Sequence, residues 1–295
     1  MITIRIGTRP SRLAVRQAEI VASAIRHAGY EVEIVKYRSE GDSDLKSPLY
    51  SIGKTGVFVE RLNSLILSGD IDAAVHSAKD IPYEIDRRLR ISAVMPRGRF
   101  EDALVSENPL SKLPPGSVIG TSSLRRRYQI LYQRKDVKVS NIRGNVDTRI
   151  EKMRSEGMAG IVMALAAIDR LELNLRYWPF DPEKFVPAPN QGIIAVVSED
   201  GSKASEVLSS INDADTYDDM MAERSITQGL KLGCSTPVGI LSRHTGKGMR
   251  ILAQFFAMDG SDMMMFDQHV DGLDDVDGIV SYIRENLPEE YGYKL

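Results

Sequence analysis

Three consecutive arginines follow a hydroxyl-rich turn in the segment GTSSLRRRYQI, residues 120–130. The glycine ends a predicted strand, and Leu124 begins a predicted helix, whose free N–H groups and positive dipole end attract anions. Guanidinium forks suit carboxylate or phosphate groups. The donors that this turn offers are Thr121, Ser122, Ser123, Arg125 and Arg126. A solvated helix end without a ligand is the alternative for an isolated arginine triplet.

The same layout recurs at three more strand-to-helix steps. The segment NIRGNVDTRIEKM has Arg143 and Gly144 in a turn and Arg149 in the next helix. Arg170 follows the third such step, and Arg9, Ser11 and Gln17 occupy the first turn of the chain. Open α/β sheets bind ligands outside the carboxyl ends of their strands. We therefore expect an arginine-lined cleft between two α/β units, which binds a ligand with several negative groups.

A lysine and an aspartate end the predicted strand of GDIDAAVHSAKDIP, residues 69–82. A Lys–Asp pair such as Lys79–Asp80 is most often a surface ion pair of little energetic value. In an arginine-lined cleft, however, a carboxylate would repel an anionic ligand unless it faced a part that becomes positive. His76 lies within the strand, where a structural histidine is the simpler interpretation.

The single cysteine lies in LKLGCSTPVGI, a predicted loop between a helix and a strand. This position favours an accessible Cys234, although a lone cysteine is commonly a small buried hydrophobe. Gly53-Lys54-Thr55 resembles the end of a phosphate-binding P-loop, but Pro48 stands where that motif requires a glycine. No histidine adjoins Cys234 in sequence, so a protease-like pair is not supported.

Composition limits the classes of function. The 295 residues carry a formal net charge of −3 and are 42% hydrophobic, which is enough for a buried core in two or three domains. The mild charge argues against a nucleic-acid coat, and no apolar run is long enough to span a bilayer. One cysteine excludes an internal disulfide and fits the cytoplasm, and no Cys/His cluster has metal-ligand spacing. No feature demands more than a monomer.

The elements that must position these residues alternate between strands and helices. A strand over 2–7, a helix from Ser11 to Gly29 and a strand over 31–37 form a βαβ opening, which favours a parallel sheet. A second, similar α/β unit begins near residue 96, and the apolar strand within 187–199 should return to the first unit. We expect a first lobe of 1–95 and 193–209, a second lobe of 96–192, and a small α+β domain of 210–295.

Taken together, these motifs resemble the porphobilinogen deaminase family, also called hydroxymethylbilane synthase. The resemblance rests on six segments, which occur in the family's order over nearly the whole chain. They are IGTRPSRLAVRQAEIV, VHSAKDIP, GTSSLRRRYQI, NIRGNVDTRIEKM, PAPNQGIIAV and LGCSTPVG. The resemblance implies two lobes like those of periplasmic binding proteins, flanking a cleft, and a third domain with the cysteine loop. It also implies condensation of four porphobilinogen molecules into hydroxymethylbilane, with ammonia released at each addition.

The resemblance assigns roles to the candidate residues. It implies a dipyrromethane cofactor joined to Cys234 by a thioether, with Asp80 as the catalytic aspartate and Lys79 as a second catalytic residue. Loss of ammonia from porphobilinogen leaves a cationic electrophile, which a carboxylate stabilises. By the family's pattern, thirteen residues correspond to those that bind the carboxylates of the cofactor and substrate. They are Arg9, Ser11, Gln17, Lys79, Thr121, Ser122, Ser123, Arg125, Arg126, Arg143, Gly144, Arg149 and Arg170.

Two departures from the family pattern stand out. Thr55 occupies the place where many relatives have a lysine, and Lys54 lies one residue earlier, which puts a ligand contact by Lys54 in doubt. Asn190 replaces the first glycine of the commoner PAxGQG, without an expected loss of function. The rival functions are a carboxylate-binding module, which would leave Asp80 and Cys234 without a purpose, and a phosphate enzyme, which the failed P-loop disfavours.

Overall fold

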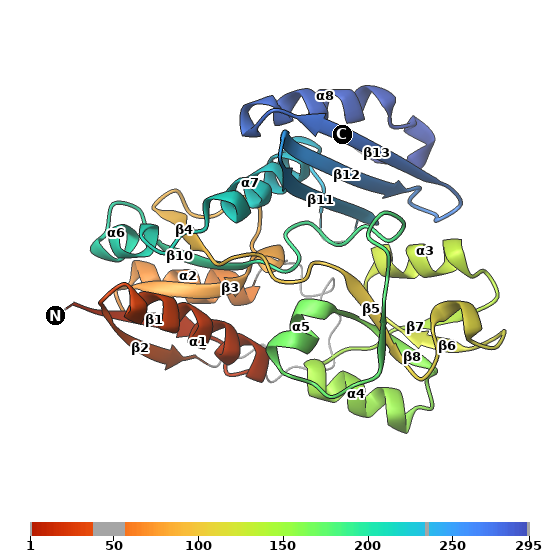
Figure 1. Cartoon of the computed structure of the whole chain (residues 1–295), viewed down its shortest axis with the longest axis horizontal. Coiled ribbons are helices and arrows are strands. Elements are labelled where there is room, and N and C mark those ends of the chain that lie inside the picture. The colour runs from red at the N-terminus through yellow and green to blue at the C-terminus, as the bar shows by residue number, and fades with distance from the viewer. Residues whose placement is uncertain (1, 38–56, 234–235, 294–295) are drawn as a thin grey trace. The chain divides into compact units, whose positions relative to one another are not determined.

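The structure is a computed structural model that describes residues 2–37, 57–233 and 236–293 (Figure 1). Lys54, Thr55 and Cys234 lie outside the described residues. By internal contacts the chain forms two compact units, one of residues 1–98 and 192–217 and the other of 99–191 and 218–295.

The first unit contains a five-stranded sheet in the order β2-β1-β3-β10-β4. The inner strand β1 pairs in parallel with both neighbours, whereas β10 is antiparallel to β3 and β4. The elements of this unit are β1 (Thr3–Thr8), α1 (Arg12–His27), β2 (Glu31–Lys36), α2 (Val57–Leu67), β3 (Ala73–Ser77), η2 (Ala78–Asp80), β4 (Leu89–Val94), β10 (Ile194–Glu199) and α6 (Lys203–Ser209).

Helix α1 shows how the sequence pattern produces this layer. Ser11 caps its N-terminus by accepting a hydrogen bond from the backbone N–H of Ala14. Ala18, Val21 and Ile25 recur at helical spacing and are fully buried against the sheet. The predicted βαβ opening is therefore confirmed, and so is the return of the late strand β10 to this first sheet.

The second unit contains another five-stranded sheet, in the order β7-β6-β8-β5-β9, with the same pattern of directions. Three parallel strands are followed by β5, which is antiparallel to both of its neighbours. The elements are β5 (Asp102–Ser106), η3 (Leu110–Lys112), β6 (Val118–Gly120), α3 (Leu124–Gln133), β7 (Lys138–Ser140), α4 (Val146–Ser155), β8 (Gly160–Ala164), α5 (Leu165–Arg170) and β9 (Tyr177–Pro179).

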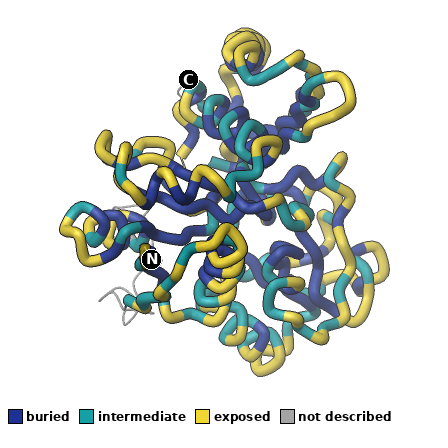
Figure 2. Tube along the Cα trace, turned by 60° about the vertical axis from the view of Figure 1, so that its left-hand side comes forward, coloured by how far each residue is buried: buried dark blue, intermediate teal, exposed yellow. Residues whose placement is uncertain are grey.

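The same unit also contains a three-stranded antiparallel sheet in the order β11-β12-β13. Its core includes Ile226, Phe255 and Ile283. The elements are α7 (Ala214–Gly229), whose first residues belong to the first unit, then β11 (Val238–Thr245), β12 (Gly248–Phe256), β13 (Met263–Val270), η4 (Leu273–Asp275), α8 (Val276–Asn286) and η5 (Glu289–Tyr291). Strands β5, β8 and β10 are buried along nearly their whole length, whereas β2 and β9 are partly exposed; Figure 2 colours the chain by burial.

The fold class predicted from the sequence, two α/β lobes and a small sheet domain, is confirmed. The sequence pattern missed short elements, namely β9 at a sheet edge, α6 between β10 and α7, and the 3-10 turns η2, η3, η4 and η5. The boundaries of the three predicted domains stay a prediction. Within the described ranges, no helix is long and apolar enough to cross a membrane.

Candidate functional site

One group of candidate residues lies at the carboxyl ends of β1 and β3. These strands are parallel neighbours, so their carboxyl ends meet at one edge of the first sheet. Arg9 directly follows β1, and the exposed Lys79 and Asp80 form the turn η2 directly after β3. The sequence predicted that these three residues follow strand ends, and in the structure they lie at one edge of the sheet.

Two hydrogen bonds fix this edge. The Nε2 atom of the buried Gln17 donates to Oγ of Ser77 over 2.9 Å, which joins α1 to the end of β3. The backbone N–H of Ala78 donates to the carbonyl of Ile193 over 3.0 Å, which fixes the start of η2. The amide of Gln17 therefore supports the turn that carries Lys79 and Asp80.

Arg9 lies on an aromatic ring. Its guanidinium carbon is 3.8 Å from the centre of the Phe58 ring, in the first turn of α2. Such stacking is attractive and limits the orientations that the guanidinium adopts. Two segments distant in sequence thus determine where the charge of Arg9 lies.

His76 is buried in β3 and contacts Oδ1 of Asn63 through Nε2 at 3.2 Å. Burial lowers its pKa from 6.5 to about 4. The unfolded chain therefore takes up a proton near pH 6.5, whereas the folded chain takes it up only near pH 4. As the pH falls through this window, folding should lose about 3 kcal/mol. His76 is thus a structural histidine, as its place in the strand indicated.

The His76→Gln variant should lack this part of the pH dependence. Urea unfolding between pH 7 and pH 4 measures the free energy of unfolding of both proteins. The variant should have a flatter profile, whereas the exposed His27→Gln should retain the slope of the original protein. Equal slopes for His76→Gln and the original protein would contradict a buried neutral imidazole.

A second group of candidate residues lies at the carboxyl ends of β6, β7 and β8 in the second unit. Strand β6 pairs in parallel with both others, so the three ends share one edge. The Ser122 hydroxyl donates to the carbonyl of Ile142 over 2.7 Å and accepts from its N–H over 3.1 Å. This pair of bonds fastens the turn after β6 to the turn after β7.

The other hydroxyls of the first turn also have partners within the protein. Ser123 caps α3 by accepting from the N–H of Arg126. Oγ1 of Thr121 accepts from the N–H of Ser123 over 3.2 Å. These side chains shape the turn, and any contact with a ligand stays a prediction.

Arg125 and Arg126 converge on a carboxylate that the sequence patterns did not single out. Nη2 of Arg125 donates to Oδ2 of Asp102 over 2.9 Å, and Nη2 of Arg126 donates to Oδ1 over 2.6 Å. All three residues are buried, and Asp102 is fully so. The sequence did contain a signal for this contact. Asp102 is the first residue of the apolar strand DALVS, and a carboxylate buried in such a strand needs a cation beside it.

This cluster has an excess of positive charge. Burial alone would raise the pKa of Asp102, but the charges of Arg126 and Arg125 and hydrogen bonds outweigh it and hold the pKa well below its ordinary value. One carboxylate therefore faces two guanidiniums. Among the described residues, Nε of Arg126 is buried and has no hydrogen-bond partner. The arrangement suits an additional anionic group.

The remaining arginines of the second group are partly buried. Nε of Arg149 donates to the carbonyl of Gly144 over 2.8 Å, and Lys152 donates to the carbonyl of Arg143 over 3.2 Å. Gly144 has a φ of +122°, which an L residue rarely adopts, so this turn requires glycine. Burial lowers the pKa of Arg170, at the end of α5, to about 10, which leaves it cationic at neutral pH.

Asn190 precedes Gln191 in the PAPNQG loop and has a φ of +62°. Glycine adopts this left-handed conformation freely, and asparagine tolerates it better than most residues. Its backbone N–H donates to the buried carboxylate of Glu223. The backbone can thus retain its shape with asparagine in place of the family's glycine.

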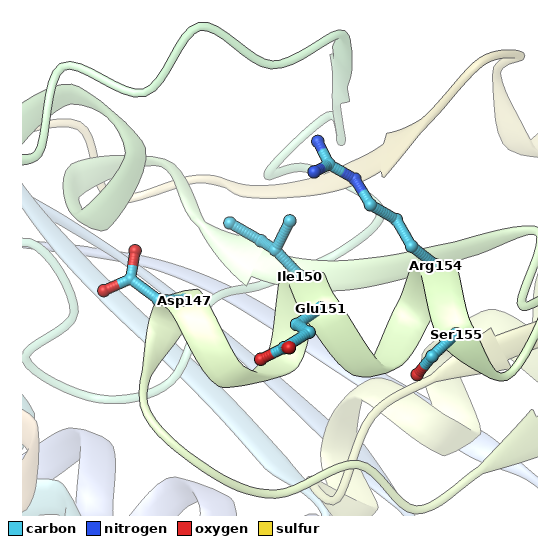
Figure 3. Close-up of a pocket in the computed structure, with 5 residues that line it drawn as sticks. All are labelled: Asp147, Ile150, Glu151, Arg154 and Ser155. Carbon is cyan, nitrogen blue, oxygen red and sulfur yellow. The ribbon is translucent and has the colours of Figure 1, made fainter.

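A shallow surface pocket lies along α4 and coincides with neither group. Figure 3 shows its lining side chains, all from this helix, with Asp147 near one end of the row and Arg154 toward the other. The other lining residues are Ile150, Glu151 and Ser155. None of the residues predicted for the site lines this pocket.

Comparisons with known proteins give a consistent result. Residues 4–206 match the family described as porphobilinogen deaminase, dipyromethane cofactor binding domain. The chain is 60% identical to a probable porphobilinogen deaminase of Thermoplasma volcanium, over 98% of each chain. It is 38% identical to the porphobilinogen deaminase of Rubrobacter xylanophilus, over 87% of this chain and 85% of that protein.

Solved structures give weaker likenesses. The methionine-binding protein MetQ has a TM-score of 0.44 and 14% identity, over 73% of this chain and 92% of that protein. A periplasmic sulfonate-binding protein of Methylobacillus flagellatus has a TM-score of 0.38 and 12% identity, over 77% of this chain and 69% of that protein.

Proposed function

The chain belongs to the porphobilinogen deaminase family, and from this premise we propose that it joins four porphobilinogen molecules head to tail into hydroxymethylbilane. One ammonia is released at each addition. The observation that carries the proposal is the 60% identity to the Thermoplasma volcanium protein over 98% of both chains. The two groups of cationic residues at strand ends support it, because each pyrrole of the substrate carries an acetate and a propionate.

A dipyrromethane cofactor joined to Cys234 by a thioether is part of the proposal. When bound, it supplies the pyrrole to which the first substrate molecule is joined. Its acidic side chains suit the donor set of the second unit, where Nε of Arg126 is buried without a partner among the described residues. The proposed cofactor ligands are Lys79, Asp80, Thr121, Ser122, Ser123, Arg125, Arg126, Arg143 and Gly144.

The proposed substrate ligands are Arg9, Ser11, Gln17, Arg149 and Arg170. Guanidinium forks bind carboxylates through two parallel hydrogen bonds. Ser11 and Gln17 contribute through the shape of the first turn, because the side chain of Ser11 caps α1 and that of Gln17 bonds to Ser77. Arg9 is already oriented by the Phe58 ring.

Asp80 is the proposed catalytic residue. Loss of ammonia from porphobilinogen leaves positive charge on the pyrrole, and a carboxylate held near the ring nitrogen stabilises that charge as it develops. The same carboxylate accepts the proton that the ring gives up after the new bond forms. Lys79, beside it in η2, is the second proposed catalytic residue and binds an acidic side chain of the ligand.

Denaturing intact-mass measurement with peptide mapping tests the proposal. The purified protein should carry the mass of one dipyrromethane on the Cys234 peptide, or gain it on incubation with porphobilinogen. Cys234→Ser is the matched control, because it removes only the sulfur nucleophile. A chain that stays bare after incubation with porphobilinogen would reject the proposed reaction.

We also infer that the protein acts as a monomer in the cytoplasm, without nucleic-acid or membrane partners. The single cysteine and the net charge of −3 support this inference. The three predicted domains, 1–95 with 193–209, 96–192 and 210–295, remain part of the proposal. Size-exclusion chromatography with light scattering should give a mass near 32.8 kDa, and a dimer mass would contradict the monomer.

A further inference from the structure

The carboxylate of Asp102 is the centre of a buried polar network in the second unit. Besides the two arginines, Nε2 of Gln191 donates to Oδ1 of Asp102 over 2.8 Å and to the carbonyl of Phe100 over 2.8 Å. Asp102 and Gln191 have no exposed surface. A ligand would have to displace these bonds to contact the carboxylate, so its role must be indirect.

The backbone of Asp102 is held at the start of an inner strand of the sheet. Strand β5 lies between β8 and β9, and Asp102 pairs with Ala164, the last residue of β8. The N–H of Phe180 donates to the carbonyl of Asp102 over 2.9 Å. The carboxylate is therefore a fixed point beside the strand ends that carry the second group of candidate residues.

The two arginines that bind this carboxylate are not equivalent. Nη1 of Arg125 donates to Oε1 of Gln129 over 2.8 Å and to the carbonyl of Val186 over 2.9 Å, so both of its Nη atoms are engaged within the protein. Arg126 donates through Nη1 to the carbonyl of Val162 over 3.2 Å. Its Nε is left without a partner among the described residues. Nε of Arg126 is thus a buried donor that remains for a ligand oxygen.

The network also reaches the third sheet. Nε2 of Gln129 donates to the carbonyl of Val186 over 2.8 Å and to Oε1 of Gln254 over 2.6 Å. Gln254 lies in β12, so the arginine pair is supported by the sheet that follows the cysteine loop in sequence. Among the described side chains, Asp102 is the only carboxylate within hydrogen-bond distance of Arg125 and Arg126.

We propose that Asp102 is a positioning residue that touches no ligand and orients Arg126 to bind one carboxylate of the cofactor or substrate. This inference rests on the proposed function. Without the negative charge, two adjacent buried guanidiniums repel each other, and Arg126 loses the bond that fixes its direction. With it, the cluster keeps one net positive charge, which a single bound carboxylate neutralises.

Asp102→Asn tests the inference, because it keeps the shape of the side chain and removes its charge. The readout is the rate at which the Cys234 peptide gains the dipyrromethane mass when apoprotein is incubated with porphobilinogen. It is measured at a temperature where circular dichroism shows the variant to be folded. We expect this rate to fall at least tenfold, and Asp102→Glu, which restores the charge, should recover part of it.

Asp72→Asn is the matched control. Asp72 binds Arg5 through Nε at 3.1 Å and Nη2 at 2.7 Å, in the first unit and outside the proposed site. Its loss should lower Tm without slowing the mass gain. A merely structural Asp102 would behave in the same way, so a normal rate in folded Asp102→Asn would overturn the inference.

Gln191→Leu keeps the inference testable if Asp102→Asn does not fold. It removes the hydrogen bond to Asp102 and leaves the charge, so the mass gain should slow by about twofold to fivefold. In that case, a normal rate in folded Gln191→Leu would overturn the inference. If the original protein never gains the mass, the proposed function fails first, and this inference falls with it.

Discussion

Asp80→Ala should lower kcat for porphobilinogen consumption by about 10²- to 10⁴-fold, the range expected for loss of a general acid–base group. The carboxylate is lost where positive charge develops, so the effect should appear in kcat, with little change in KM. Steady-state kinetics with ammonia release as the readout measure both constants. Asp80 is exposed in a three-residue turn, so the fold should persist.

Glu84→Ala is the control for this experiment. Glu84 is an exposed carboxylate four positions further along the chain, and its removal should leave kcat within twofold of the original value. Asp80→Asn should be as impaired as Asp80→Ala, because it keeps the size and loses the charge. A near-normal kcat in Asp80→Ala would remove Asp80 from the catalytic role.

Arg126→Leu should weaken ligand binding by about 10- to 150-fold, because one charged hydrogen bond contributes about 1.5–3 kcal/mol. The loss should appear as slower gain of the dipyrromethane mass and as a raised KM in the fraction that carries it. Asp102 would keep Arg125 as its partner, so no buried carboxylate is left alone. Mass spectrometry and steady-state kinetics provide the two readouts.

Arg127→Leu is the matched control, since the same change is made one residue further along the same helix. Arg127 is exposed, whereas Arg126 is buried against Asp102. The Arg127→Leu protein should gain the dipyrromethane mass and consume porphobilinogen at the same rates as the original protein. Equal effects of the two changes would mean that the charge of the helix, and not the buried guanidinium, matters.

Much of the fold could be predicted from local patterns. The apolar spacing within α1 and its Ser11 cap are readable because helix periodicity and capping depend on neighbours within a few residues. Strand β10 could be assigned from its continuous apolar run after a Pro/Gly-marked turn. The edge strand β9, which ends in Pro179, and the short helix α6 were missed, although the equally short β6 and α5 were found.

Part of the candidate site was also readable. Arg9, Lys79 and Asp80 directly follow predicted strands, and parallel strands bring such residues to one edge. The positions of the candidate arginines therefore followed from the alternation of strands and helices, before any side chain was placed. Whether a residue directly follows a strand depends only on its near neighbours in the chain, so it can be predicted from the sequence.

The partners of those side chains are not local. The same residue type stands at three consecutive positions, 125–127, yet Arg125 and Arg126 are buried and Arg127 is exposed. Their partner Asp102 lies 24 residues before Arg126, and Gln191 lies 65 residues after it. The sequence by itself determined which residue types stand at the strand ends. Only the tertiary structure decided which guanidiniums are bound internally, because that depends on which distant strand and loop pack beside α3.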